Sequence, residues 1–133
     1  MADSLREPAE FAVFDGDLDD HWTERYLQVT TVAVDTEAMG LIHGRDRLCL
    51  VQIADEHDRV CCVRIGLGQQ SAPKLKRVLE AQNVEKIFHF ARFDVAALAT
   101  GLAINVAPLF CTKVGSRLVR TYTARHGLKD LVM

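Results

Sequence analysis

Short apolar runs separated by polar turns divide the chain into strands and helices. Four runs in the first half, at 11–14, 29–37, 48–53 and 60–65, are rich in the β-branched and aromatic residues typical of strands. The first two runs are separated by an acidic turn and by residues 18–27, which are predicted to form a short helix. Because short loops join the last three runs, we expect these strands to form an antiparallel meander.

The second half alternates helices with strands. A helix is predicted after Ser71, which can cap it, with Pro73 in its first turn and an apolar stripe formed by Leu75, Val78 and Leu79. An apolar and therefore buried helix is predicted at 92–100, between strands at 86–90 and 106–111. Thr112 is expected to cap a helix that runs to about residue 122, and another helix begins near residue 128.

This order of elements predicts the fold class. A three-stranded antiparallel meander followed by α-β-α-β-α is the order of a ribonuclease-H-like α/β domain with a mixed sheet. The pattern favours this fold over a generic doubly wound domain but does not exclude the latter. With 133 residues the chain is long enough for one domain with a proper core and too short for two, so residues 1–133 are assigned to a single domain.

The amino-acid composition indicates the class of protein and its cellular compartment. With 49% hydrophobic and 26% charged residues the chain resembles an ordinary globular protein, and no apolar run is long enough to span a membrane. The first ten residues do not resemble a signal peptide, and the four cysteines lack C-x-x-C spacing, so we expect free thiols in a cytoplasmic protein. The net charge is −2, but residues 112–133 hold five bases and one acid, which could attract phosphates locally.

Asp35 and Glu37 end the second apolar run and are the strongest chemical signal in the chain. Side chains alternate along a strand, so these two carboxylates lie side by side on one face, at the end of a buried strand. Two close anions repel unless a cation lies between them, and hard oxygen ligands suit Mg²⁺ or Mn²⁺. The alternative is a solvated pair of acids at a strand end, which is common by chance.

Asp94 is a third candidate ligand. It lies in the first turn of the predicted buried helix, directly after a strand, where α/β domains often place their ligands. An acid at this position is also stabilised by the helix dipole alone and needs no other role. If it points toward Asp35 and Glu37, the three carboxylates complete much of a two-metal site.

Four segments in the right order resemble the ribonuclease D family, in particular its short alphaproteobacterial members. Residues 34–41 (VDTEAMGL) are similar to the first exonuclease motif of the family and residues 86–94 (KIFHFARFD) to the second. Residues 45–52, and the segments 111–113 and 125–131, resemble further parts of the family. The resemblance runs from about residue 11 to the end.

The resemblance implies a 3′→5′ exonuclease that uses two metal ions, Mg²⁺ or Mn²⁺, on the 3′ ends of single-stranded RNA, or of single-stranded DNA. It implies that Asp35 bridges both metals, that Glu37 holds the first and that Asp94 serves the second, largely through water. Met39, Gly40 and Leu41 would contact the terminal nucleotide, which His89 and Phe90 would border. Without the resemblance, the preferred interpretation of His89 is a core histidine whose ring nitrogens are hydrogen-bonded by the backbone.

The chain departs from the family in one respect, and this lowers the nuclease activity that we expect. The third motif of the family supplies a Tyr that orients water and a last Asp that binds metal, and it falls beyond Leu131. The fold is therefore expected to be truncated at its C-terminal end and impaired as a nuclease, and apolar surface left near Leu118, Tyr122 and Leu128 would favour a homodimer. The rival hypotheses are a catalytically inactive nucleic-acid-binding or interaction module with the same fold, and an unrelated α/β domain with a chance Asp-x-Glu.

Overall fold

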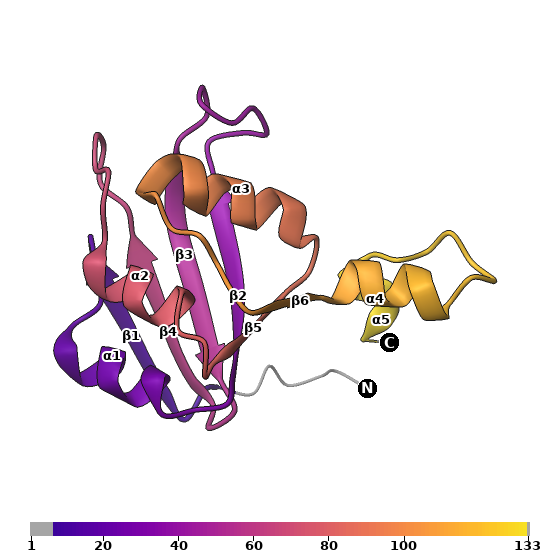
Figure 1. The fold of residues 1–133 in the computed structure, drawn as a ribbon, viewed down its shortest axis with the longest axis horizontal. Coiled ribbons are helices and arrows are strands. Elements are labelled where there is room, and N and C mark those ends of the chain that lie inside the picture. The colour runs from indigo at the N-terminus through magenta and orange to yellow at the C-terminus, as the bar shows by residue number, and fades with distance from the viewer. Residues whose placement is uncertain (1–6, 133) are drawn as a thin grey trace.

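The computed structural model describes residues 7–132 and contains six strands and five helices in that range (Figure 1). The strands are β1 (Glu10–Asp15), β2 (Thr31–Ala38), β3 (Leu48–Asp55), β4 (Arg59–Arg64), β5 (Glu85–Phe88) and β6 (Leu109–Cys111). The helices are α1 (Asp20–Leu27), α2 (Pro73–Leu79), α3 (Ala91–Leu102), α4 (Thr112–Val119) and α5 (Leu128–Leu131). Every predicted element is present, with boundaries that differ by a few residues.

The strands form one mixed sheet in the order β1-β4-β3-β2-β5-β6. Strands β2, β3 and β4 are antiparallel neighbours, which confirms the predicted meander, and β5 and β6 continue the sheet parallel to β2. The lead-in strand β1 pairs in parallel with β4 at the other edge, a position that the sequence did not indicate. This is the ribonuclease-H-like α/β arrangement that the order of elements predicted.

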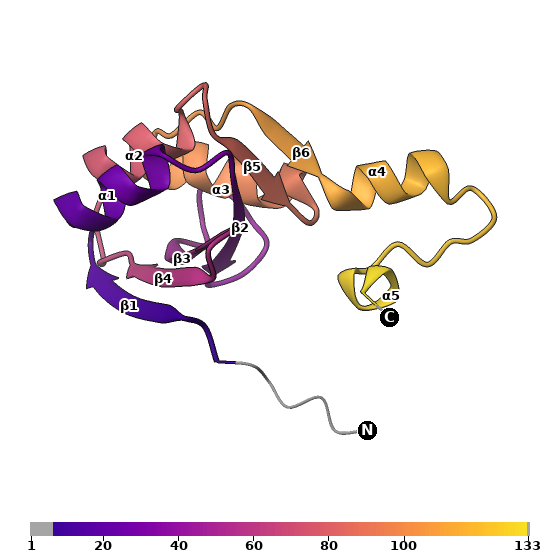
Figure 2. The same cartoon turned by 90° about the horizontal axis from the view of Figure 1, so that it is seen from below.

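Helices α1, α2 and α3 all lie over one face of the sheet, and the core fills the space between (Figure 2). We call this the covered face, and the opposite side of the sheet the open face. The fully buried core side chains come from both layers: Val51, Ile53 and Val63 from the sheet, and Tyr26, Leu75, Leu79, Leu98 and Leu102 from the helices. Alternation along the strands leaves every second residue on the open face.

Three details differ from the sequence-based expectations. Ser71 does not cap α2; the carboxylate of Asp17 instead accepts hydrogen bonds from the backbone N–H groups of Lys74 and Leu75, at 2.9 and 2.8 Å. Helix α3 is buried only on the side that packs against β2, β3 and β5, and its other side, which includes Arg92, Ala99 and Thr100, is exposed. Strand β6 begins only after Pro108, since proline has no N–H to donate to a neighbouring strand.

The C-terminal part of the described chain extends away from the sheet. Helix α4 continues outward from β6, and α5 returns beside the open face (Figures 1 and 2). Its apolar side chains are exposed as expected, among them Leu118 at 74%, Tyr122 at 79% and Leu128 at 52%. A homodimer through this surface stays a prediction. Among the residues that the structure describes, no helix is long and apolar enough to cross a membrane.

Candidate active site

Asp35 and Glu37 lie on the open face at the end of β2. Both are exposed, whereas Val34 and Thr36, the residues that alternate with them, are buried on the covered face. In the antiparallel register, Asp35 is opposite Gln52 of β3 and Glu37 is opposite Leu50. The sequence-based prediction that the two carboxylates share one strand face is therefore confirmed in this structure.

Asp94 approaches the same strand from the covered face. It is 4% exposed in the first turn of α3, and its carboxylate accepts a hydrogen bond from the hydroxyl of Thr36. Thr36 is the residue between Asp35 and Glu37, so all three acids surround one segment of β2. Burial raises the pKa of Asp94 to about 6, and the charges of Asp35 and Glu37 add to the increase, while the Thr36 hydrogen bond opposes it.

The three carboxylates fit a divalent cation by their chemistry more than by their present arrangement. Their oxygens are the ligands that Mg²⁺ and Mn²⁺ prefer, and a nearby cation would oppose the increase in the pKa of Asp94 that burial and, to a lesser extent, the charges of Asp35 and Glu37 cause. Within residues 7–132, however, no three His, Cys, Asp or Glu side chains are close enough together to hold one ion. Asp35 and Glu37 are the pair that could bind directly, with Asp94 behind them.

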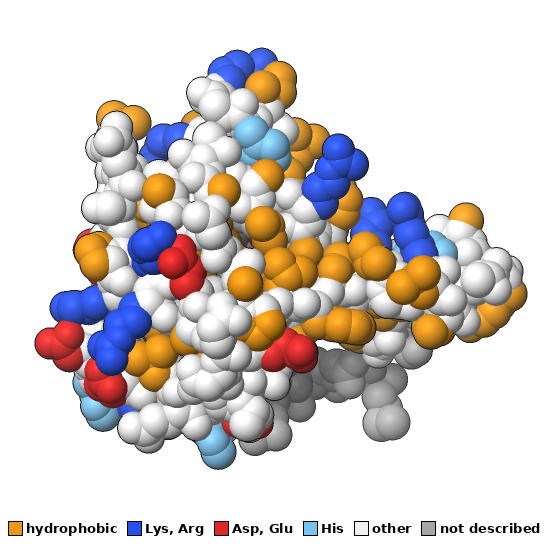
Figure 3. All heavy atoms as spheres, viewed as in Figure 1, with side chains coloured by type: hydrophobic (Ala, Val, Ile, Leu, Met, Phe, Trp, Pro, Cys, Tyr) orange, Lys and Arg blue, Asp and Glu red, His pale blue; other side chains and the backbone are white. Residues whose placement is uncertain are grey.

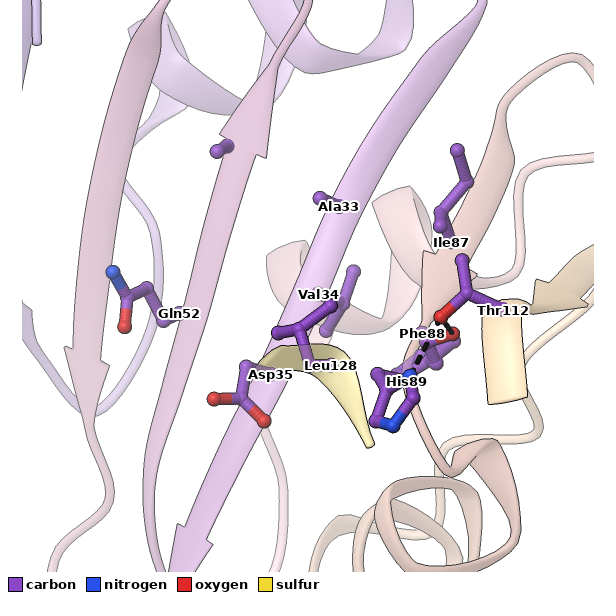
Figure 4. Close-up of a pocket in the computed structure, with 10 residues that line it drawn as sticks. Ala33, Val34, Asp35, Gln52, Ile87, Phe88, His89, Thr112 and Leu128 are labelled. Carbon is purple, nitrogen blue, oxygen red and sulfur yellow. Dashed lines mark hydrogen bonds between the residues drawn. The ribbon is translucent and has the colours of Figure 1, made fainter. Parts of the chain in front are cut away.

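A pocket of about 390 Å³ lies beside Asp35 on the open face. Side chains of β2, β3 and β5 form its floor, and Thr112 and Leu128 close it from α4 and α5 (Figure 4). Its polar lining consists of Asp35, Gln52, His89 and Thr112. The sequence did not indicate Gln52 as a site residue, although its place opposite Asp35 follows once the strand register is known.

His89 lines this pocket together with Asp35, and its predicted place at the 3′ nucleotide stays a prediction. Its Nδ1 is 2.8 Å from Oγ1 of Thr112, and the same oxygen lies 3.2 Å from the carbonyl oxygen of Phe88. Partial burial and the neighbouring ammonium of Lys113 lower the pKa of His89, and the charge of Asp35 opposes this. Thr112 was expected to cap α4, but it is the first residue of that helix and its hydroxyl serves His89 and Phe88 instead.

Three other predicted residues lie on the loop that follows β2. Met39 and Leu41 are 70% and 80% exposed, so both are available to a nucleotide base. Gly40 also has a structural role, because the Cβ of any other residue at this position would overlap the carboxylate of Asp46. That carboxylate accepts a hydrogen bond from the backbone N–H of Ile42 at 2.9 Å and so closes the loop.

Phe90, the last predicted site residue, has a strained backbone. Its φ of 61° and ψ of 54° lie in the left-handed region that residues with a Cβ seldom adopt. Phe90 is 46% exposed, and Nζ of Lys113 lies 4.2 Å from the centre of its ring. Such a geometry persists only when the surrounding structure maintains it, and it often occurs at functional sites.

Basic side chains extend from the site along α4. Lys113, Arg117 and Arg120 are spaced for one side of the helix, and Figure 3 shows Lys and Arg side chains over α4 and on the β2–β3 loop. Apolar side chains lie between these two groups in the same view. This view is from the side of α1, α2 and α3, so the surface that it shows is on the covered side of the sheet and not on the open face that carries Asp35.

Comparison with known proteins decides the family. A sequence model described as 3′-5′ exonuclease matches residues 11–133, nearly the whole chain. The chain belongs to this 3′-5′ exonuclease family. The Asp35–Glu37 pair and Asp94 therefore lie in an exonuclease domain, which makes a chance Asp-x-Glu in an unrelated fold the wrong reading.

Two relatives illustrate the likeness. NrnC of Brucella melitensis, solved with bound Mg²⁺, is 43% identical to this chain and superposes with a TM-score of 0.85, which covers 92% of this chain and 59% of NrnC. The structure of NrnC bound to pGG has the same sequence identity of 43% and a TM-score of 0.84, which covers 92% of this chain and 58% of NrnC. Ribonuclease D of Sphingobium indicum is 32% identical over 85 residues, which are 64% of this chain and 22% of that protein. The chain thus spans less than two thirds of these relatives.

Proposed function

We propose that this domain is a metal-dependent 3′→5′ exonuclease that removes nucleotides from the 3′ ends of single-stranded RNA. The observation that carries the proposal is the placement of Asp35 and Glu37 on the open end of β2, with Asp94 hydrogen-bonded to the threonine between them, in a chain of the exonuclease family. The Mg²⁺ in NrnC and its complex with pGG support the choice of cofactor and substrate class.

In this proposal Asp35 and Glu37 would hold the metal, and the carboxylate of Asp94 would contribute to the same site from the covered face. Bound divalent ions supply an activated water and neutralise charge on the leaving 3′ oxygen. The chain itself positions the substrate: the exposed side chains of Met39 and Leu41 contact the terminal base, and Phe90 offers a ring on which any base can stack. Stacking does not depend on which base is present, and this suits an enzyme that removes successive nucleotides whatever the RNA sequence.

A second candidate function is a nucleic-acid-binding module without catalysis. It is favoured by the separation of Asp94 from the Asp35–Glu37 pair in the described part of the chain, where no three ligands are gathered. Residues 1–133 also contain no counterpart of the family's third motif. We therefore expect the 133-residue chain to be a slow nuclease, because misplacing a catalytic group by about 1 Å can cost 10²-fold in rate.

The decisive assay follows 5′-labelled single-stranded RNA in Mn²⁺ with the 133-residue chain and with a version that continues through the family's third motif. The proposal expects a ladder of products shortened from the 3′ end, formed at least about 100-fold faster by the longer version, which corresponds to about 2.7 kcal/mol. Asp35→Asn in the longer version should abolish the ladder. Glu85→Gln, an exposed acid at the other end of the sheet, is the matched control and should leave the ladder unchanged.

Each outcome separates the candidates. RNA binding without a ladder in either version would establish the binding module and overturn the exonuclease. Equal rates for the two versions would show that residues 1–133 already supply the missing ligand, so the expected impairment would be wrong. A ladder that survives Asp35→Asn would exclude the proposed metal site.

A further inference from the structure

The hydroxyl of Thr112 contacts two groups whose chemistry fixes the direction of both hydrogen bonds. The Phe88 carbonyl oxygen, 3.2 Å away, can only accept, so the hydroxyl must donate its single hydrogen there. The same oxygen can then only accept from Nδ1 of His89, 2.8 Å away. Both contacts are hydrogen bonds only when Nδ1 carries a hydrogen. The other neutral tautomer would compete for the Thr112 hydrogen and leave two acceptors facing each other.

This arrangement determines what His89 offers to the pocket. With the hydrogen on Nδ1, the lone pair of the neutral ring is on Nε2, on the side of the ring away from Thr112 (Figure 4). No residue in the range 7–132 forms a hydrogen bond to Nε2. The pocket therefore presents the Nε2 lone pair as an acceptor that is not among the proposed metal ligands, next to the Asp35 carboxylate, which is one of them.

We propose that Thr112 is a positioning residue that holds His89 in its Nδ1–H tautomer, so that Nε2 accepts a hydrogen bond from a ribose hydroxyl of the 3′-terminal nucleotide and favours RNA over DNA. The Nε2 lone pair suits a group that donates, such as a hydroxyl of a ribose, and it disfavours direct contact with a phosphate oxygen, which only accepts once ionised. A deoxyribose 3′ end has one hydroxyl fewer to donate. This proposal rests on the proposed function, since it assumes that a nucleotide 3′ end enters the pocket.

The first test reads the tautomer without nuclease activity. Two-bond ¹H–¹⁵N correlation spectra at neutral pH distinguish a ring nitrogen that carries hydrogen from one with a lone pair. We expect hydrogen on Nδ1 and a lone pair on Nε2 in the wild type and in Thr112→Ser, and a shift toward the Nε2–H tautomer in Thr112→Val. His126, whose Nδ1 is 2.8 Å from Ser116 Oγ, is an internal control that should not change in any variant.

Two results of this test would overturn the positioning role. One is a wild-type His89 that carries hydrogen on Nε2, alone or as the imidazolium ion. The other is a Thr112→Val protein whose His89 tautomer is unchanged while the His126 signals show an intact fold. A His89→Asn variant identifies the His89 signals among those of the five histidines.

The second test concerns the ribose. AMP and 2′-deoxy-AMP are products rather than substrates of an exonuclease, so both can be titrated in Mg²⁺ without turnover. One hydrogen bond contributes about 0.5–1.5 kcal/mol, so the wild type should bind AMP about twofold to tenfold more tightly than 2′-deoxy-AMP. The preference should persist in Thr112→Ser and be lost in Thr112→Val. Equal affinities in the wild type, or no binding of either nucleotide, would overturn the ribose assignment, whereas the exonuclease proposal is decided separately by the RNA ladder.

Discussion

On one face of β2, Val32, Val34 and Thr36 are buried against the helices, whereas on the other face Ala33, Asp35 and Glu37 are exposed. The backbone is the same, and only the alternation of side chains separates the two sets. The covered face fixes the strand in a packed core, and the open face presents the carboxylates from that fixed support. A site on a rigid strand holds its ligands more closely than one on a loop.

The two faces are connected through Thr36 and Asp94. Asp94 is an acid on the covered face, and the Thr36 hydroxyl donates to it from within the strand that carries Asp35 and Glu37. Its raised pKa shows that burial and the two acids on the other side both act on it. Stability and candidate chemistry are therefore coupled at this one point of the strand, and elsewhere along β2 they are separable.

The largest expected difference between the faces is in stability. Ile53 of β3 is opposite Val34 and fully buried, while its neighbour Gln52 is opposite Asp35 and exposed. Ile53→Ala should lower the free energy of unfolding by about 2–5 kcal/mol through lost burial and a cavity. Gln52→Ala should change it by less than about 0.5 kcal/mol. Urea unfolding measures both, and similar losses for the two variants would contradict the division into a packed and an open face.

A smaller loss is expected where the faces meet. Thr36→Val keeps the shape of the side chain but leaves the buried Asp94 carboxylate without the hydroxyl that donates to it. We expect this variant to lose about 1–3 kcal/mol in urea unfolding at pH 7. Thr36→Ser retains the hydroxyl and should recover most of that loss. If Thr36→Val were as stable as the wild type, Asp94 would not depend on this hydrogen bond.

Lys86 sharpens the comparison because it is a fully buried charge on the covered face. Its Nζ donates to the carbonyl oxygens of Ala81 and Ala107, at 2.6 and 2.9 Å, and burial lowers its pKa from 10.5 to about 8, with Glu80 opposing. Between about pH 8 and 10.5 the unfolded chain still holds the proton that the folded chain has released. Stability should therefore increase with pH across this window, by up to about 1.4 kcal/mol per pH unit.

Urea unfolding from pH 7 to 11 tests this prediction. The free energy of unfolding of Lys86→Met is subtracted from that of the wild type at each pH, and this difference should increase with pH. The substitution removes the titrating group, so other groups that ionise in this range cancel in the difference. A difference that stays flat, or that falls as the pH rises, would show that Lys86 is not the charged group responsible.

Local sequence patterns are sufficient to predict the helices and strands, but they do not predict contacts between residues that are distant in sequence. The alternation at 29–37 correctly placed Asp35 and Glu37 together, because a strand period of two is independent of the rest of the fold. The cap of α2 was assigned to Ser71, although Asp17, 57 residues from Lys74, supplies it. No local signal marks such a partner. The parallel pairing of β1 with β4 was missed for the same reason.

The candidate site shows the same limit. The family resemblance indicated His89 as a site residue, and the structure has it in a pocket with Asp35, but the sequence pattern predicted a helix cap for the hydroxyl of Thr112. Its actual partners became visible only when β5 and β6 were placed side by side. Thr36 was also missed, because the prediction used the open face of β2 and treated the covered face as packing. The metal ligands themselves remain a prediction.

The smallest expected effect concerns the path of the nucleic acid, and it compares α4, which extends beyond the sheet, with the helices of the covered face. Arg117 on α4 is exposed and, among residues 7–132, forms no ion pair, whereas Arg77 on α2 is exposed and paired with Glu24 at 2.9 Å. If RNA leaves the pocket along α4, Arg117→Gln removes one phosphate contact and Arg77→Gln removes none. Affinity for a single-stranded RNA should fall about twofold to fivefold in the first variant, and the slope of log affinity against log salt should become shallower by about 0.7. Fluorescence anisotropy at several salt concentrations measures both quantities.

Because a phosphate contact releases counterions, a weaker affinity with an unchanged salt slope would mean that Arg117 acts on folding or on a base instead. An equal effect of Arg77→Gln would mean that the RNA follows the covered side, or that binding is unspecific attraction to any surface cation.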